Sequence, residues 1–165
     1  MGKTHENLMA AFAGESQANR KYLAFAKKAD DEGFAQVARL FRAVAHAETL
    51  HALTHFRSAG EVGTTAENLK AAIAGESYEN TQMYPAFMKD AEAEGETRAL
   101  KSFHWANEAE KVHEVLYKDA LEALGKPGEE YDYYICPVCG YTHARVAPEK
   151  CPVCGVPGSR FEKVS

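Results

Sequence analysis

Residues 47–51 read Ala-Glu-Thr-Leu-His, and residues 109–113, which lie 62 positions later, read Ala-Glu-Lys-Val-His. In both stretches a glutamate precedes a histidine by three positions, so on a helix the two side chains point the same way. Glu-x-x-His pairs from two helices, together with single glutamates from two others, form two-metal sites inside four-helix bundles. These stretches therefore predict a duplicated helical unit that encloses metal.

The duplication extends beyond the two motifs. Residues 11–16, Ala-Phe-Ala-Gly-Glu-Ser, correspond to residues 72–77, Ala-Ile-Ala-Gly-Glu-Ser, at an offset of 61. The offset becomes 62 at Tyr22 and Tyr84, so one residue is inserted between Glu76 and Tyr84 in the second copy. An internal repeat of this length indicates duplicated supersecondary structure.

Each copy is predicted to be a helical hairpin, because helix-forming residues dominate and apolar residues recur at helical spacing. Gly33 and Gly95 are typical of helix C-termini at the two turns. A capping box at residues 64–67, Thr-Thr-Ala-Glu, begins the third helix. Pro85 should kink that helix or open one of its backbone hydrogen bonds. The helices expected cover residues 4–32, 34–59, 65–94 and 96–124.

Helix geometry brings the carboxylates to one level. Glu15 lies 18 residues before Gly33, and Glu48 lies 15 residues after it, which is a height difference of about 5 Å at 1.5 Å per residue. The corresponding separations in the second hairpin are 19 and 15 residues. Inward carboxylates repel one another unless cations join them. Oxygen and imidazole ligands favour iron or manganese over calcium or structural zinc.

The C-terminal residues predict a small strand-and-turn module with a metal site of its own. The cysteines form two pairs, Cys136-Pro-Val-Cys139 and Cys151-Pro-Val-Cys154, each followed by glycine. Four thiolates in such knuckles surround one ion tetrahedrally. A zinc ribbon has the same spacing, so the cysteines alone leave iron and zinc equally open.

Bulk composition excludes several functional classes. The formal net charge is -5 and no polybasic run is present, which argues against binding to nucleic acid. No apolar run is long enough to cross a bilayer, and the first residues lack the apolar stretch of a signal peptide. We therefore expect a cytoplasmic protein whose paired cysteines bind metal.

Taken together, the motifs Gly-Glu-Ser, Glu-x-x-His and Cys-Pro-x-Cys-Gly, each present twice, resemble the rubrerythrin family over essentially the whole chain. The resemblance implies an all-α ferritin-like four-helix bundle over residues 1–128 and a rubredoxin-like domain over residues 131–165. It implies two non-haem irons in the bundle and one iron in the four-cysteine site, where zinc is a possible substitute.

The resemblance also implies roles for individual residues. Glu48 and Glu110 match bridging carboxylates, and Glu15 and Glu76 match terminal ligands. His113 matches a fixed imidazole ligand. The remaining matches are His51 and Glu79, which alternate on one iron with the carboxylate bound in the oxidised state; Tyr22 and Tyr84, which hydrogen-bond ligand carboxylates; and Cys136, Cys139, Cys151 and Cys154, which hold the single iron.

The activity implied by the resemblance is reduction of hydrogen peroxide to water, with electrons delivered through the rubredoxin-type centre. The expected electron donor is a rubredoxin or an NAD(P)H-dependent reductase, and the expected role is protection against oxidative stress. Two other classes stay open: a ferroxidase or iron-handling protein like ferritin, and a non-catalytic metal-binding protein with zinc in its tail.

Chain connectivity leads to a prediction about assembly. In a ferritin-like bundle the second and third helices run parallel, so their connection must travel the length of the bundle. Helices of roughly 27 residues are about 40 Å long, whereas the four residues 60–63 reach only about 14 Å. We therefore expect a domain-swapped homodimer. The alternative is an up-down-up-down bundle, which a short loop can close within one chain.

Overall fold

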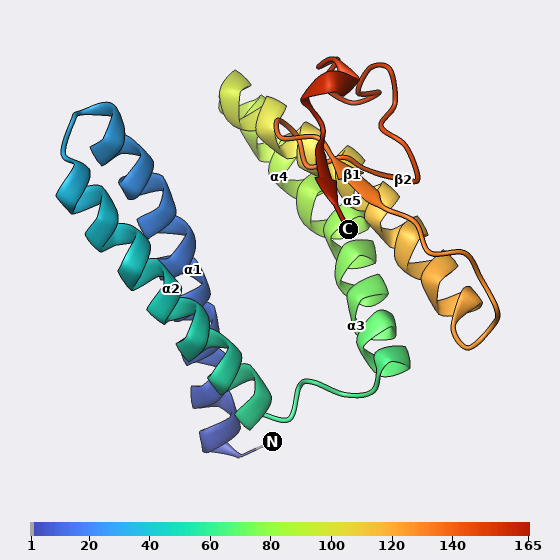
Figure 1. Cartoon of the computed structure of the whole chain (residues 1–165), viewed down its shortest axis with the longest axis horizontal. Helices are drawn as coiled ribbons and strands as arrows, with labels where there is room; N and C mark the ends of the chain where they lie inside the picture. Colours follow the sequence, from blue (N-terminus) through green and yellow to red (C-terminus); the bar gives the residue numbers. More distant parts are fainter. Residues whose placement is uncertain (1) are drawn as a thin grey trace. The chain divides into compact units, whose positions relative to one another are not determined.

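The computed structural model describes residues 2–165, which form two compact units that divide between Gly63 and Thr64. The first unit is an antiparallel hairpin of α1 (Lys3–Asp31) and α2 (Ala35–Ser58) (Figure 1). Its turn depends on Gly33, whose φ of +83° favours glycine. The Phe34 N–H donates to the carbonyl of Ala29, which closes the helix end in the predicted way.

Small residues form the buried seam of this hairpin. The best-buried side chains are all alanines: Ala26, Ala29, Ala38, Ala45 and Ala52. Alanine lets two helices approach closely, but it buries little apolar area for each residue. Large apolar side chains of the same hairpin are exposed, among them Leu40 at 60% and Leu50 at 56%.

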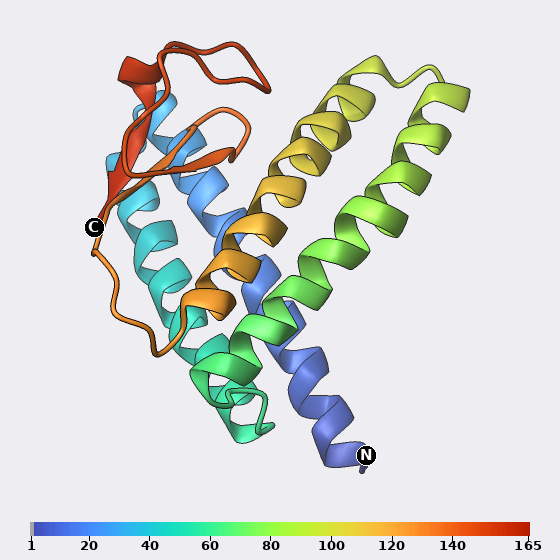
Figure 2. The same ribbon diagram turned by 90° about the vertical axis from the view of Figure 1, so that its right-hand side faces the viewer.

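The second unit begins with the predicted capping box. The Thr64 hydroxyl accepts from the Glu67 N–H, and the Glu67 carboxylate accepts from the Thr64 N–H at 2.8 Å. The helix that follows consists of α3 (Thr65–Tyr78), the π turn η1 (Glu79–Met83) and α4 (Tyr84–Ala93). It runs antiparallel to α5 (Thr97–Ala123), as the green and yellow ribbons of Figure 2 show.

The π turn contains the one-residue insertion detected in the repeat. Within it the Tyr84 N–H donates to the carbonyl of Glu79, five residues back, where an α-helix would use the residue four back. One extra residue in an α-helix would rotate all later side chains by about 100°. The π turn absorbs that residue, so Tyr84 packs against Phe103 as Tyr22 packs against Phe41. Pro85 follows directly, at the start of α4.

A three-stranded antiparallel sheet completes the chain. The strands are β1 (Tyr133–Ile135), β2 (Thr142–Ala144) and β3 (Glu162–Val164), in the order β2-β1-β3. No helix within residues 2–165 is both long and apolar enough to cross a membrane. The predicted fold class, ferritin-like helices followed by a small rubredoxin-like module, is confirmed, and the four helical segments end within one residue of the predicted positions.

Candidate metal centres

The first hairpin brings three of the predicted ligands together. Glu15 of α1 and Glu48 and His51 of α2 offer ligand atoms that all lie within 4.8 Å of one another. The His51 Nδ1 is 2.8 Å from the Glu48 Oε2, while the His51 side chain remains 57% exposed. Within this hairpin the imidazole therefore lies at the edge of the group.

The second unit contains the corresponding group, formed by Glu76 of α3 and Glu110 and His113 of α5. The His113 Nδ1 lies 2.6 Å from the Glu110 Oε2 and 3.9 Å from the Glu76 Oε2. The imidazole of this group is better covered than that of the first hairpin, because His113 is 25% exposed. Each hairpin thus presents two carboxylates and one imidazole at one level, as the spacing predicted.

Crowding of the two carboxylates perturbs their protonation. Burial, followed by the hydrogen bond and the negative charge of Glu110, raises the pKa of Glu76 to about 7. The hydrogen bond from His113 lowers the pKa of Glu110, and the same bond raises the pKa of His113. The metal-free group therefore holds protons near neutral pH, as expected where a cation would replace them.

Glu79 occupies the first position of the π turn. Burial, then repulsion by Glu110, raises the pKa of the Glu79 carboxyl group. The charge of Glu79 therefore interacts with the group formed by Glu76, Glu110 and His113. Its oxygens are not among the ligand atoms of residues 2–165 that cluster within 4.8 Å. Glu79 thus lies beside the tight group rather than within it.

The two predicted tyrosines occupy matching positions in the two hairpins. Tyr22 packs on Phe25 and Phe41, and Tyr84 packs on Phe87 and Phe103. Burial, together with the nearby carboxylates, raises the pKa of Tyr84. Its phenol therefore keeps its proton and is available as a hydrogen-bond donor beside the carboxylate group.

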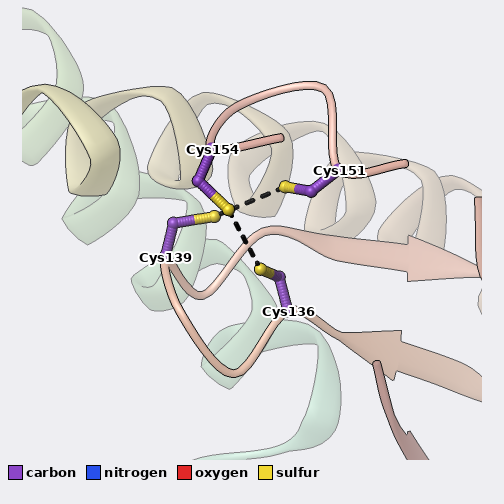
Figure 3. A group of neighbouring side chains, drawn as sticks. All are labelled: Cys136, Cys139, Cys151 and Cys154. Carbon is purple, nitrogen blue, oxygen red and sulfur yellow. Dashed lines mark hydrogen bonds between the residues drawn. The ribbon is translucent and has the colours of Figure 1, made fainter. Parts of the chain in front are cut away.

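The four cysteine sulfurs converge from two loops (Figure 3). Cys136 and Cys154 are 3.5 Å apart at sulfur, and Cys139 and Cys151 are 3.6 Å apart. Four sulfurs placed tetrahedrally at about 2.3 Å from one ion would be separated by about 3.8 Å. The observed spacing therefore suits a single tetrahedral metal ion.

The backbone of the two knuckles supports thiolate ligands. Gly140 and Gly155 have φ of +80° and +78°, and this backbone conformation allows each loop to reverse direction directly after its second cysteine. Burial opposes ionisation of Cys151, but backbone N–H groups of Cys154 and Val153 donate to its sulfur and lower its pKa to about 7. Such N–H···S bonds stabilise the charge that metal binding requires.

One contact joins the cysteine module to the carboxylate group. The His113 Nε2 lies 3.1 Å from the carbonyl oxygen of Gly140 and 3.0 Å from the Thr142 Oγ1. A carbonyl only accepts, so Nε2 carries a hydrogen and donates. Nδ1 faces Glu110, and it is the nitrogen that would bind a metal in exchange for its proton.

The sequence did not reveal two features of this region. The contact of His113 with Gly140 joins positions 27 residues apart and had no signal in the sequence. The second feature is Asn80, which is only 8% exposed inside the π turn. A signal for Asn80 existed, because asparagine stands four residues after the glutamate in both copies of the repeat.

Comparison with known proteins gives a consistent result. The rubrerythrin family model matches residues 6–121, and the model of the rubrerythrin rubredoxin-like domain matches residues 134–162. Nigerythrin from Nitratidesulfovibrio vulgaris is 39% identical, over 98% of this chain and 86% of its own. Rubrerythrin-2 from Clostridium acetobutylicum is 38% identical, over 96% of this chain and 95% of its own.

Solved structures agree with the sequence relatives. Nigerythrin in its fully reduced, all-ferrous state matches with a TM-score of 0.61 at 38% identity, covering 99% of this chain and 88% of that chain. The donor types fit the cofactors of such proteins, since carboxylates and imidazoles suit a di-iron site and four thiolates suit a single iron. The chain therefore belongs to the rubrerythrin family, with a di-iron site and a rubredoxin-like site of four cysteines.

Proposed function

We propose that this oxidoreductase reduces hydrogen peroxide to water and thereby protects against oxidative stress. The reaction consumes two electrons and two protons for each peroxide and yields two waters. The observation that carries the proposal is the hydrogen bond between His113 and Gly140. This bond joins the carboxylate group of the helices to the four-cysteine site of the same chain, which is a type of metal site that transfers one electron at a time.

The proposed ligands of the iron pair are the residues that the two hairpins present at one level. Glu48 and Glu110 would hold both irons, Glu15 and Glu76 would hold one iron each, and His113 would be the fixed imidazole ligand. His51 and Glu79 would alternate as ligands of one iron, the carboxylate in the oxidised state and the imidazole in the reduced state. The position of Glu79 beside the carboxylate group of the second unit supports this exchange. When bound, the iron pair supplies the two electrons that cleave the O–O bond.

The chain itself controls protons and orientation around that pair. Tyr84 keeps its phenolic proton beside the carboxylates, and its O–H would serve as a hydrogen-bond donor to one of them. Tyr22 has the equivalent role in the first hairpin. The His113 Nε2–H, held by Gly140 and Thr142, fixes the orientation of the ring.

Electrons enter through the cysteine module in this proposal. Cys136, Cys139, Cys151 and Cys154 hold one iron, and Gly140 follows Cys139 directly in the chain. The route from the Cys139 thiolate to the His113 imidazole therefore runs from Cys139 through the backbone of Gly140 and across one hydrogen bond. The external donor is a rubredoxin or an NAD(P)H-dependent reductase, in the cytoplasm, where thiols stay reduced.

We further propose that the di-iron site is shared between two chains. Between α2 and α3 lie residues 59–64, six residues that reach about 20 Å at most. Helix α2 has 24 residues, or about 36 Å, so the loop is too short for a connection that runs the length of the bundle. In a domain-swapped homodimer, the exposed Leu40 and Leu50 would pack against the second unit of the partner. We also propose that residues 1–128 supply the helices of the bundles and that residues 131–165 form the cysteine module.

Stopped-flow mixing tests the activity. The chemically reduced protein is mixed separately with hydrogen peroxide and with dioxygen, and oxidation is followed by absorbance. We expect oxidation by peroxide to be faster. Faster oxidation by dioxygen, together with uptake of iron beyond the two metal sites, would instead indicate a ferroxidase.

A further inference from the structure

Asn80 is the buried polar residue of the π turn. Its Nδ2 donates two hydrogen bonds, to the backbone carbonyl of Glu76 at 2.8 Å and to the Glu114 Oε2 at 2.7 Å. The first bond spans one turn of its own helix, and the second crosses to α5. The side chain thus ties the π turn to the facing helix at the residue directly after Glu79.

The first repeat shows what the same asparagine does in a regular helix. Asn19 follows Glu15 by four residues, as Asn80 follows Glu76. Its Nδ2 donates to the backbone carbonyl of Ala45 at 2.6 Å and to the Thr49 Oγ1 at 2.8 Å, both on the facing helix. In the copy with the inserted residue, the cross-helix partner is a carboxylate instead.

That carboxylate is held from a second side. The Lys118 Nζ donates to the Glu114 Oε1 at 2.6 Å, and the Glu114 side chain is only 16% exposed. Glu114 also follows His113 directly on α5. Hydrogen bonds to charged groups are about twice as strong as neutral ones, so the bond from Asn80 to Glu114 is a firm attachment for the π turn.

We propose that Asn80, anchored by Glu114, is a positioning residue that holds the π turn so that Glu79 can bind iron in the oxidised state. This inference rests on the proposed exchange between Glu79 and His51. An inserted residue can be placed in several ways along a helix, and only some of them present Glu79 to the carboxylate group. The amide of Asn80 selects among these placements, because it bonds the second residue of the turn to a fixed point on α5.

The test measures the midpoint potential of the iron-loaded di-iron site in wild type and in Asn80→Ala. Glu79 stabilises the oxidised state, so weaker positioning should favour reduction. We expect the oxidised-to-reduced ratio at a given potential to fall at least tenfold, which is about 59 mV for a one-electron step. The matched control is Asn19→Ala, which removes the equivalent amide from the first repeat, where no residue is inserted. This variant should change the oxidised-to-reduced ratio by less than about twofold.

A double-mutant cycle shows whether Asn80 acts through Glu79. In a Glu79→Ala background, Asn80→Ala should produce no further change in the potential. A full additional change there would overturn the proposal, and so would equal potentials in wild type and Asn80→Ala. Amide hydrogen exchange over residues 79–83 should also be faster in Asn80→Ala than in Asn19→Ala.

A second pair of variants decides the question if Asn80→Ala does not fold or load iron. Glu114→Gln keeps an oxygen acceptor for Asn80 but loses the charge, so its potential should lie between those of wild type and Glu114→Ala. Glu114→Ala removes the acceptor and should reproduce the expected fall, again only when Glu79 is present. Equal potentials in these two variants would overturn the proposal. Because potentials are measured without peroxide, these results are separate from the test of peroxide reduction.

Discussion

The His113 Nε2 donates a hydrogen bond of 3.1 Å to the carbonyl oxygen of Gly140. One side of this imidazole therefore faces the carboxylates of Glu76 and Glu110, and the other faces the knuckle that contains Cys139. The hydrogen bond fixes which ring nitrogen is free to bind metal. It also places the backbone of the cysteine site in contact with the imidazole of the carboxylate group.

The first prediction concerns the hydroxyl that shares this contact. Thr142→Val removes one of the two acceptors of the His113 Nε2–H. Loss of such outer contacts lowers metal affinity by about 10- to 100-fold, and we expect the low end because Gly140 remains. Competition with a chelator measures the affinity. Thr54→Val is the control, since its hydroxyl donates within its own helix to Leu50, and equal affinities in both variants would contradict the prediction.

The second prediction concerns the exposed imidazole. His51→Ala should bind two irons in the oxidised protein, because Glu79 then fills the position. The reduced protein should react with peroxide at least about tenfold more slowly, since the ligand of the reduced state is missing. Single-turnover stopped-flow measurements provide the rate. Unchanged kinetics would remove the exchange of ligands from the proposed function.

A third prediction separates electron supply from peroxide chemistry. Cys151→Ser replaces one of the four sulfurs that lie 3.5 Å or 3.6 Å from a neighbour in the cluster. Turnover with a reductase should be lost, while one oxidation of the chemically reduced di-iron site by peroxide should persist. Both reactions are followed by absorbance. Loss of both would show instead that the module is needed for the structure of the helical site.

The fourth prediction concerns pH. The raised pKa of Glu76, about 7, and the raised pKa of His113 mean that both hold protons that metal must displace. Affinity should therefore fall as the pH is lowered from about 8 to about 6, and the fall should approach tenfold per unit for each displaced proton once the pH is below the pKa of its group. Titration with ferrous iron in weak buffer measures both affinity and proton release. Affinity independent of pH would contradict it.

The same protonation affects the metal-free fold. The folded state binds the proton of Glu76 more tightly than the unfolded chain, whose ordinary pKa is 4.5. The contribution of this group to stability is therefore complete below pH 4.5 and is lost as the pH rises to about 7. Bound iron should remove this loss, which denaturant unfolding at several pH values can measure.

The fifth prediction tests the swapped dimer by complementation. One variant carries Glu15→Ala and Glu48→Ala, and the other carries Glu76→Ala and Glu110→Ala. In a swapped heterodimer one site collects all four substitutions and the other is intact, so random co-assembly should restore about a quarter of the sites. Iron content and peroxide turnover of co-expressed protein are the measurements. No recovery above the separate variants would show that each site comes from one chain.

The sequence by itself determined the helices, their ends and the carboxylates and imidazole that meet within each hairpin. These features depend on residues close in the chain: Gly33 permits a positive φ, Thr64 and Glu67 cap each other, and Glu-x-x-His spacing places both side chains on one face. The cysteine knuckles are local in the same sense. The one-residue insertion between Glu76 and Tyr84 was also visible from the repeat.

Only the tertiary structure decided the form that the insertion takes. An extra residue can rotate the rest of a helix or be absorbed in a π turn, and local propensity does not distinguish these outcomes. Packing against α5 distinguishes them, because Glu76 meets Glu110 before the insertion and Tyr84 meets Phe103 after it. Contacts with α5 before and after the insertion keep the side chains of Glu76 and Tyr84 directed at α5, so the extra residue between them is accommodated as a π turn. The hydrogen bond from His113 to Gly140 likewise depends on how the cysteine module packs on α5, which no local pattern encodes.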